Sequence, residues 1–286
     1  MRFLWSAIAA LCVAVLAACW GVSLTAGQVP AQLPMEPVLD SGSSITGAFE
    51  GWYKNNDGTY SILVGYLNRN QKQTLDIPVG PDNHIDPGGP DQGQPTHFLP
   101  RRQWGVFTVT VPKDFGTKRL TWTITANGQT TSIPLDINPL WVVEPFEDAG
   151  VGNTPPIVRF EQGSKSVYTG PPHGFGATYT VKSGDPLALT VWVTDDGKVP
   201  PEAQRRREGP PATIFWSKFR GPGSVTFDDP RPKLAMEDGK GSTTAKFSDP
   251  GDYILRLQAN DGSGEGGGGF QCCWTNVHVK VTVTKN

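Results

Sequence analysis

Basic excess, helical periodicity and long apolar segments are all scarce in this sequence of 286 residues. Lysine and arginine number 25 against 27 aspartates and glutamates, which argues against nucleic acid or any other partner that is bound through its phosphates. After residue 25 no long stretch carries the apolar stripe of an amphipathic helix. With 34 glycines and 26 prolines, the composition predicts an all-β protein.

Motifs for catalysis are also missing. The sequence contains neither a Gly-x-Ser-x-Gly elbow nor a His-Glu-x-x-His zinc motif, and its four histidines are scattered over His84, His97, His173 and His278. We therefore predict that the protein is not an enzyme. A metal-dependent extracytoplasmic enzyme, assembled from residues far apart in the sequence, is an alternative that stays open.

Cysteine is rare, and two of the four cysteines lie near the amino terminus. Arg2 precedes an apolar run at 3–16 that is too short to cross a bilayer but suits a secretory signal. The tetrapeptide Leu16-Ala17-Ala18-Cys19 follows at once and resembles the lipobox of bacterial lipoproteins. The resemblance implies a signal peptide at 1–18 and acyl chains on Cys19, which would hold the exported protein on a membrane, in the periplasm or on the cell surface.

Two other interpretations of the amino terminus stay open. The signal could be cleaved near Ala26, or the apolar segment could run on through 20–24 as an uncleaved anchor. Lipidation accounts best for the cysteines, because Cys12 leaves with the signal and Cys19 is acylated. Only Cys272 and Cys273 then remain as thiols in an oxidising compartment.

The chain is long enough for two domains. Residues 19–44 are rich in Pro, Gln, Gly and Ser and are expected to form a flexible tether. A first β-sandwich domain is predicted at 45–137, with hairpin turns at Asn55-Asn56-Asp57-Gly58 and Ala126-Asn127-Gly128. Its expected strands are 48–53, 60–67, 74–79, 105–111, 119–125 and 130–137.

One long connection interrupts this domain at 80–102. His84, Asp86, Asp91 and His97 lie in it and are candidate metal ligands, but they lack the close paired spacing of a metal motif. Because the segment is rich in proline and glycine, a solvated loop is the expectation we prefer.

A linker is predicted at 138–156, where four prolines keep the chain extended. Its apolar side chains are too numerous to stand in water, so they should pack on one domain or on the junction. They are Leu140, Trp141, Val142, Val143 and Phe146.

The stretch 248–262 predicts a corner, a strand and a turn in succession. Pro250 and Gly251 bend the chain, and from Tyr253 onwards apolar and polar residues alternate, so one face of the strand should be buried and the other mostly wet. The run from Asp249 to Tyr253 has the form Asp-x-Gly-x-Tyr and resembles the tyrosine corner that opens strand F of an immunoglobulin-like (Ig-like) sandwich. The resemblance is closest to bacterial extracellular modules of the polycystic-kidney-disease (PKD) type and implies a phenol that bonds a nearby backbone group.

The second domain is accordingly predicted at 157–286 as an Ig-like, PKD-like β-sandwich. Trp216 resembles the core tryptophan of such sandwiches, with Phe215 as the other inward candidate. The expected strands are 157–160, 178–182, 187–194, 213–219, 243–247, 253–259 and 277–284. Arg205-Arg206-Arg207 should be a solvated loop, with contact to anionic lipid or glycan as the alternative.

Acidic residues suggest a calcium site at the junction. In an Ig-like fold, three loops gather at the end where the chain enters, and carboxylates meeting there would repel one another unless a cation such as Ca²⁺ lay between them. Turn chemistry alone is the competing explanation. The candidate ligands are Asp195, Asp196, Glu237, Asp238, Asp261, Glu147 and Asp148.

Cys272 and Cys273 are adjacent, and adjacent residues in a regular strand point to opposite faces. They form either a vicinal disulfide across a distorted peptide or one buried and one half-exposed thiol.

Three functions follow from these observations. The first is a non-enzymatic envelope lipoprotein with a structural, adhesive or protein-binding role. The second is a glycan-binding module, for which Trp52, Tyr53 and Trp104 would stack on sugar rings. The third is the metal-dependent enzyme described above.

Overall fold

The computed structural model describes residues 39–148, 150, 152–198, 210, 212–261, 263 and 272–286. The expected signal peptide, Cys19, the tether up to residue 38 and Arg205–Arg207 lie outside the described residues. Within the described ranges the regular elements are β-strands and one short 3-10 helix, η1 (Pro139–Trp141), and no helix there is long and apolar enough to cross a membrane. The all-β prediction is confirmed.

The first sandwich packs two three-stranded sheets face to face. Their strand orders are β1–β2–β6 and β4–β7–β8, and a short pair, β3–β5, lies beside them. The strands are β1 (Ile45–Lys54), β2 (Tyr60–Asn68), β3 (Leu75–Asp76), β4 (Asn83–Asp86), β5 (His97–Phe98), β6 (Arg101–Val111), β7 (Leu120–Ala126) and β8 (Gln129–Leu135).

Period-two patterning explains these strands. Along β7, buried residues alternate with half-buried ones from Leu120 to Ala126, and Trp122 lies at the centre of the core. The turn after β7 places Asn127 and Gly128 at φ of 51° and 75°, which is the positive φ that a two-residue hairpin needs. The predicted hairpin there is confirmed.

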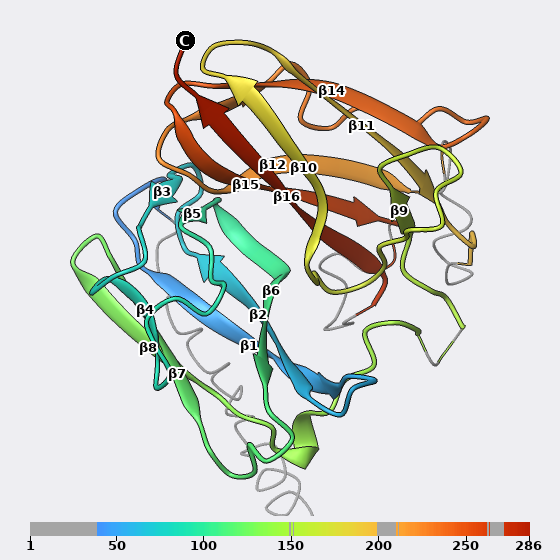
Figure 1. Cartoon of the computed structure of the whole chain (residues 1–286). Helices are drawn as coiled ribbons and strands as arrows, with labels where there is room; N and C mark the ends of the chain where they lie inside the picture. The colour runs from blue at the N-terminus through green and yellow to red at the C-terminus, as the bar shows by residue number, and fades with distance from the viewer. Residues whose placement is uncertain are drawn as a thin grey trace, which may run out of the picture. The chain divides into compact units, whose positions relative to one another are not determined.

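The second sandwich has the strand order of an Ig fold. One sheet runs β10–β16–β15–β12 and the other β13–β14–β11–β9 (Figure 1). These correspond to strands A′-G-F-C and D-E-B-A, and β10 pairs with β16 in parallel, as strand A′ does with strand G. The strands are β9 (Ile157–Arg159), β10 (Phe175–Lys182), β11 (Leu187–Thr194), β12 (Thr213–Arg220), β13 (Val225–Phe227), β14 (Lys240–Phe247), β15 (Gly251–Asn260) and β16 (Trp274–Thr284).

Tyr253 and Trp216 both lie in the core of this sandwich. The hydroxyl of Tyr253 donates to the carbonyl oxygen of Asp249 at 2.8 Å and accepts from the amide of Gly223 at 3.0 Å. This is the hydrogen-bond pattern of a tyrosine corner, and it fixes the start of β15.

The outer face of β15 differs from the prediction. Arg256 and Gln258 lie on the face that is expected to be mostly wet, yet they are 3% and 5% exposed. The first sandwich lies against this face, since Arg256 bonds Gln103 and Trp104, and Phe219 and Ile254 pack with the core residues of the first sandwich. Alternation along a strand shows which face is polar, but it does not show whether another domain covers that face.

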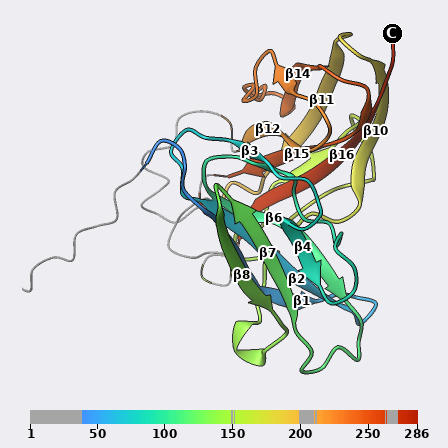
Figure 2. The ribbon, with the colours of Figure 1, turned by 90° about the vertical axis from the view of Figure 1, so that its left-hand side faces the viewer.

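The same contact explains why β2 is buried on both faces. Ile62 and Val64 belong to the core of the first sandwich, whereas Leu63 points to the opposite face and is nevertheless fully buried. Figures 1 and 2 show the β1–β2–β6 sheet between the β4–β7–β8 sheet and the second sandwich. Residues 38–286 accordingly form one compact unit.

The segments that flank the first sandwich also have defined contacts. Residues 39–44 were expected in the tether, but the carbonyls of Leu39 and Asp40 accept hydrogen bonds from the amides of Gln71 and Lys72.

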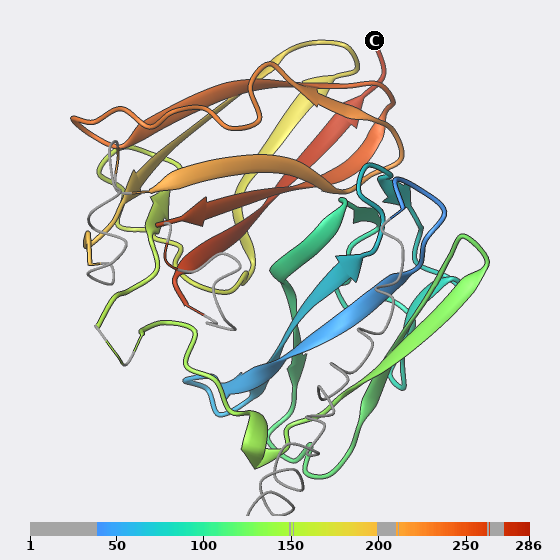
Figure 3. The ribbon, with the colours of Figure 1, turned by 180° about the vertical axis from the view of Figure 1, so that it is seen from behind.

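The linker runs from η1 to β9 (Figure 3). Of its apolar residues, Val143 is buried beside β1, whereas Leu140, Trp141 and Val142 are exposed, contrary to the expectation that they pack.

Candidate functional site at the junction of the sandwiches

The open edge of strand β6 is covered by side chains of the second sandwich. Nη2 of Arg256 donates to the carbonyl oxygen of Trp104 at 3.0 Å, Nδ2 of Asn276 to that of Gly105 at 2.8 Å, and Nε2 of His278 lies 3.2 Å from that of Val106. Arg256 is itself held by Asn276, whose Oδ1 lies 2.8 Å from Nε. Three successive carbonyls of an edge strand are therefore satisfied from another sheet.

At Gly105 the backbone of the first sandwich lies close against the second sandwich. A side chain there would overlap the indole of Trp274, which is fully buried. Its amide donates to Oε2 of Glu50 at 2.7 Å, and Arg102 forms an ion pair with the other oxygen of Glu50. Burial raises the pKa of Glu50, while the Arg102 guanidinium opposes that rise.

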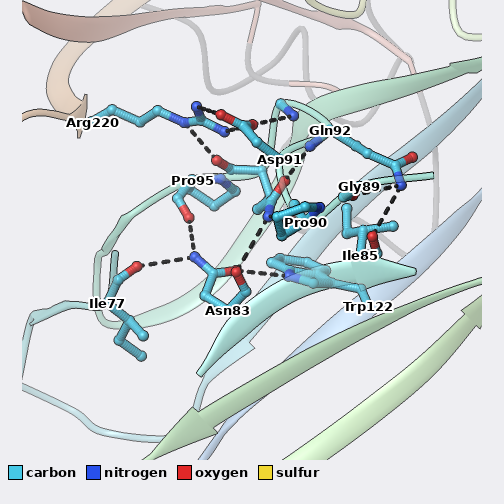
Figure 4. Close-up of polar contacts among 12 residues, drawn as sticks. Ile77, Asn83, Ile85, Gly89, Pro90, Asp91, Gln92, Pro95, Trp122 and Arg220 are labelled. Carbon is cyan, nitrogen blue, oxygen red and sulfur yellow. Dashed lines mark hydrogen bonds and ion pairs between the residues drawn. The ribbon is translucent and has the colours of Figure 1, made fainter. Parts of the chain in front are cut away.

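Segment 80–102 is not a solvated loop. Asn83 is fully buried and its amide donates to the carbonyls of Ile77 and Pro95, while its oxygen accepts from the indole of Trp122 (Figure 4). The side chain of Gln92 ties the outer part of the segment to the carbonyls of Ile85, Pro87 and Gly89. Buried amide side chains thus hold a segment that has little regular structure.

The second sandwich docks on this segment through Arg220. Its guanidinium forms a bidentate pair with Asp91, at 2.8 and 3.0 Å, and its Nε donates to the carbonyl of Gln94 at 2.7 Å (Figure 4). The hydrogen bonds from Arg220 lower the pKa of Asp91. Beside it, Asp76 accepts from Lys218 and lies against His97, each at 2.9 Å. Burial lowers the pKa of His97, so this histidine is neutral near pH 7.

His278 lies in the middle of the junction. It stacks on Phe219 with ring centroids 4.2 Å apart. Burial, aided by the charges of Arg256 and Arg220, lowers the pKa of His278 to about 3. The imidazole is therefore neutral and donates a hydrogen bond to β6.

A groove of about 700 Å³ opens beside these contacts, a volume in the range of ligand sites. The first sandwich contributes hydroxyl, amide and carboxylate groups from the β1–β2 hairpin and from β6. The linker and residues 167–175 contribute apolar side chains, of which Phe146, Val167 and Phe175 are exposed and Pro172 is buried. The polar group is Asn55, Asp57, Thr59, Ser61, Thr108 and Thr110, and the apolar group is Phe146, Val167, Pro172 and Phe175. We call these the polar wall and the apolar wall.

The candidate metal ligands of segment 80–102 are engaged separately. His84 lies 3.3 Å from Asp86, His97 is bound to Asp76, and Asp91 is paired with Arg220. Among the residues that the structure describes, no three His, Cys, Asp or Glu side chains lie close enough together to hold a metal ion.

The seven acids proposed for calcium do not form such a group either. Asp196 accepts from the amide and hydroxyl of Thr154, and Asp261 accepts from Asn153 at 2.6 Å. The loops after β11 and β15 therefore do reach the linker, but through hydrogen bonds to polar groups. Asp148, Asp195 and Asp238 accept from amides two residues further on, at Gly150, Gly197 and Lys240. These are local turn contacts, while Glu147 and Glu237 are exposed.

Cys272 and Cys273 are joined in a disulfide, and the peptide bond between them is cis. Both are buried, and the carbonyl oxygen of Asn153 lies 3.7 and 3.3 Å from their sulfurs. The pair thus lies under the end of the linker.

The three aromatic residues proposed to stack on sugars do not form a shared platform. Tyr53 is buried and packs edge-on against Phe146. Trp52 packs edge-on against Tyr60 and donates to the carbonyl of Asn138, and Trp104 lies under the guanidinium of Arg102. The groove was missed because its walls come from the β1–β2 hairpin, β6, the linker and residues 167–175, which no local pattern connects.

No known family matches the sequence, and no curated protein is similar to it. Among solved structures, the chain is similar to the titin domains z1z2 in complex with telethonin, at 11% identity over 84% of this chain and 97% of that one, with a TM-score of 0.25. It is similar to the D00–D0 domain of intimin at 11% identity, over 84% of this chain and all of that one (100%), with a TM-score of 0.26.

A third similar structure comprises domains 4 and 5 of the S-layer protein SbsC, at 10% identity and a TM-score of 0.24. This match covers 57% of the present chain and 65% of that one, less than two thirds of its length. Because all three TM-scores are low, the Ig-like assignment rests on strand order and register and not on these likenesses.

Proposed function

We propose that this chain is an exported, non-enzymatic protein of the cell envelope with a structural, adhesive or protein-binding role. The observation that supports this role best is the junction, where Arg256 and Arg220 are hydrogen-bonded to backbone carbonyls of the first sandwich. Such contacts hold the two sandwiches as one rigid body, because separating them would leave buried polar groups unpaired. A rigid pair of sandwiches keeps its loops and its groove in a fixed relation, as a binding or spacing element requires.

We further propose that the second sandwich is a PKD-type module and that lipid on Cys19 anchors the protein. The lipobox-like tetrapeptide at 16–19 supports the anchor. The position would be periplasmic or on the cell surface, and the partner a protein or a glycan.

Fractionation of cells that express the full chain tests this proposal. Cys19→Ser should move the protein from membranes into the soluble extracytoplasmic fraction, whereas Cys12→Ser, a matched change inside the signal, should leave it in membranes. Retention of the Cys19→Ser protein on membranes after a carbonate wash would contradict the lipid anchor. Recovery of the wild-type protein from the cytoplasm would contradict export altogether.

Glycan binding is the second candidate function. The observation that favours it is the groove, where an apolar wall faces a row of hydroxyl groups.

A further inference from the structure

We propose that the groove between the sandwiches binds a neutral saccharide chain, with its apolar wall stacking on the sugar rings and its polar wall bonding their hydroxyl groups. This deepens the proposed binding role and rests on it.

Three of the four residues of the apolar wall are exposed although they are large and hydrophobic. Phe146, Val167 and Phe175 are 44%, 42% and 46% exposed, and all three line this one groove. Exposed apolar side chains that gather in a hollow, and are not scattered singly, mark a binding surface. Flat aromatic rings offer the C–H faces of a sugar a large contact area at a small cost in side-chain entropy.

The apolar wall is also held in place before any ligand arrives. The ring of Phe146 packs edge-on against Tyr53 with centroids 5.4 Å apart, and it fills the space beside Gly170 that any side chain there would occupy. The hydroxyl of Thr108 donates to the carbonyl of Pro172 at 3.1 Å and so ties the segment before β10 to β6. Because both walls are fixed, a ligand loses little free energy to ordering the site.

The polar wall supplies hydrogen-bonding groups in a row. Ser61 and Thr110 are cross-strand neighbours on β2 and β6, so their hydroxyl groups lie on one face of the sheet. The side-chain amide of Asn55 donates to the hydroxyls of Ser61 and Thr59 and fixes their positions. Asp57 stands at the end of this row, and Oδ1 accepts from both the amide and the hydroxyl of Thr59. From the described residues, its Oδ2 accepts no hydrogen bond and so is available to a ligand hydroxyl.

The charges of the groove lining favour a neutral ligand over an acidic one. Asp57 is ionised near pH 7, because its hydrogen bonds from Thr59 lower its pKa, and no lysine or arginine lines the groove itself. Lys113, outside the lining, also lowers the pKa of Asp57, so its positive charge already interacts with this carboxylate. A phosphorylated or carboxylated ligand would therefore meet a carboxylate in the lining and no cation of the lining.

An extended peptide is disfavoured by the state of β6. Peptides commonly bind by adding a strand to an open sheet edge. At β6, the carbonyls of Trp104, Gly105 and Val106 already accept from the second sandwich, so that part of the edge is occupied. A ligand rich in hydroxyl groups fits the remaining side-chain donors and acceptors better.

Affinity electrophoresis tests the proposal, using the mature chain with Cys19→Ser in gels that contain amylose, mannan, xylan or soluble chitin fragments. Alginate and heparin serve as acidic probes, and a mixture of random peptides, followed by fluorescence anisotropy, covers the peptide alternative. At least one neutral polysaccharide should retard the protein, and calorimetry with its oligosaccharides then gives the Kd.

Two groove variants and two matched controls connect binding to the site. Phe175→Ala should weaken binding about tenfold by loss of ring stacking, and Asp57→Asn should weaken it by loss of an ionised acceptor. Leu140→Ala and Asp114→Asn change exposed residues outside the groove, and these variants should bind as the wild type does. Melting curves verify that each variant is folded.

Failure of every neutral glycan to bind overturns the proposal, as does binding that both groove variants retain. If the acidic probes or the peptides bind more strongly than the neutral glycans do, the proposal that the ligand is a neutral saccharide is wrong. None of these results affects membrane attachment, which is measured separately through Cys19, so the two proposals can fail independently.

Discussion

Nη2 of Arg256, in the second sandwich, donates a hydrogen bond of 3.0 Å to the carbonyl oxygen of Trp104, in the first. Arg256 is 3% exposed, so its charge is compensated almost entirely by protein groups. We expect Arg256→Ala to lower the free energy of unfolding by roughly 3 kcal/mol, because Trp104 and Asn276 would lose a charged partner. Denaturant unfolding of the variant and of the wild type measures this difference in free energy.

The control for this change is Lys246→Ala, which removes an exposed cation in β14 and should cost little. If both variants unfold at the same denaturant concentration, Arg256 does not hold the junction. Small-angle scattering should also show a wider range of interdomain arrangements in Arg256→Ala than in wild type.

Tyr253→Phe tests the tyrosine corner. It removes a hydroxyl that bonds both Asp249 and Gly223 inside the core, so we expect a loss of about 1–3 kcal/mol in unfolding free energy. Tyr179→Phe is the matched control, since this phenol is half-exposed and should contribute little. A thermal melt of Tyr253→Phe identical to that of wild type would show that the corner hydrogen bond contributes nothing to stability.

Stability should fall with pH in the range where histidine titrates. The pKa of His278 is about 3 in the folded protein, against an ordinary value of 6.5 in the unfolded chain. A lowered folded pKa means that the stabilisation is complete above pH 6.5 and is lost progressively as the pH falls toward 3. At pH 5 the loss should reach roughly 2 kcal/mol, which denaturant unfolding at each pH measures.

His278→Gln keeps a side-chain amide that can donate to β6 but cannot titrate. This variant should show a shallower decline between pH 6.5 and 5, because His97, whose pKa is also lowered, still favours unfolding as the pH falls, while Glu50, whose pKa is raised, acts in the opposite direction. Asp76 and Asp91 contribute in the same direction as His97, but only near pH 4 and below, because their pKa values are lowered from 3.8. Equal slopes in the variant and the wild type would mean that His278 is not buried at the junction.

Calcium should have no effect on the melting temperature. The acidic residues nearest the linker, Asp196 and Asp261, already accept hydrogen bonds from Thr154 and Asn153, and no third acid lies close by among the described residues. A ligand stabilises a protein only if the folded state binds it. A melt in millimolar Ca²⁺ against the same buffer with chelator measures this, and a higher melting temperature with Ca²⁺ would reinstate the predicted site.

Both cysteines of the vicinal pair should resist thiol reagents. Cys272 and Cys273 are bonded to each other and buried, so the folded, mature protein with Cys19→Ser should take up no maleimide. Unfolding together with a reductant should expose two thiols, which intact-mass measurement counts. Labelling of the folded protein without reductant would indicate free thiols.

Strands of the second sandwich were predictable because local patterns determine them. Alternating residues locate β11 and β16, and Pro250 and Gly251 mark the corner before Tyr253, so the seven expected strands differ from the observed ones by only a few residues. The short strand β13 was not predicted. The strand order follows from the Ig-like resemblance, which was identified from neighbouring residues at the start of β15.

The junction was not predictable in the same way. Arg256 and Gln258 have the alternation of a solvent-facing row, and only the three-dimensional fold shows that β6 lies against them. Segment 80–102 was mistaken for a solvated loop because its polar composition is that of surface loops, whereas its buried residue Asn83 uses that polarity to satisfy backbone groups. The groove is lined by residues of both sandwiches and of the linker, so it could not be foreseen from local patterns either.

Because the second sandwich covers the edge of β6, the first sandwich cannot be separated from it without exposing that edge. A fragment that ends at residue 137 would expose Trp104, Gly105 and Val106 as an unsatisfied strand edge, which is a template for pairing with a second copy. By covering this edge, the second sandwich therefore prevents the first sandwich from pairing with a second copy. When this part of the chain is transferred to another protein, by recombination between genes or in the laboratory, the unit that must move together is the pair of sandwiches and not either one alone.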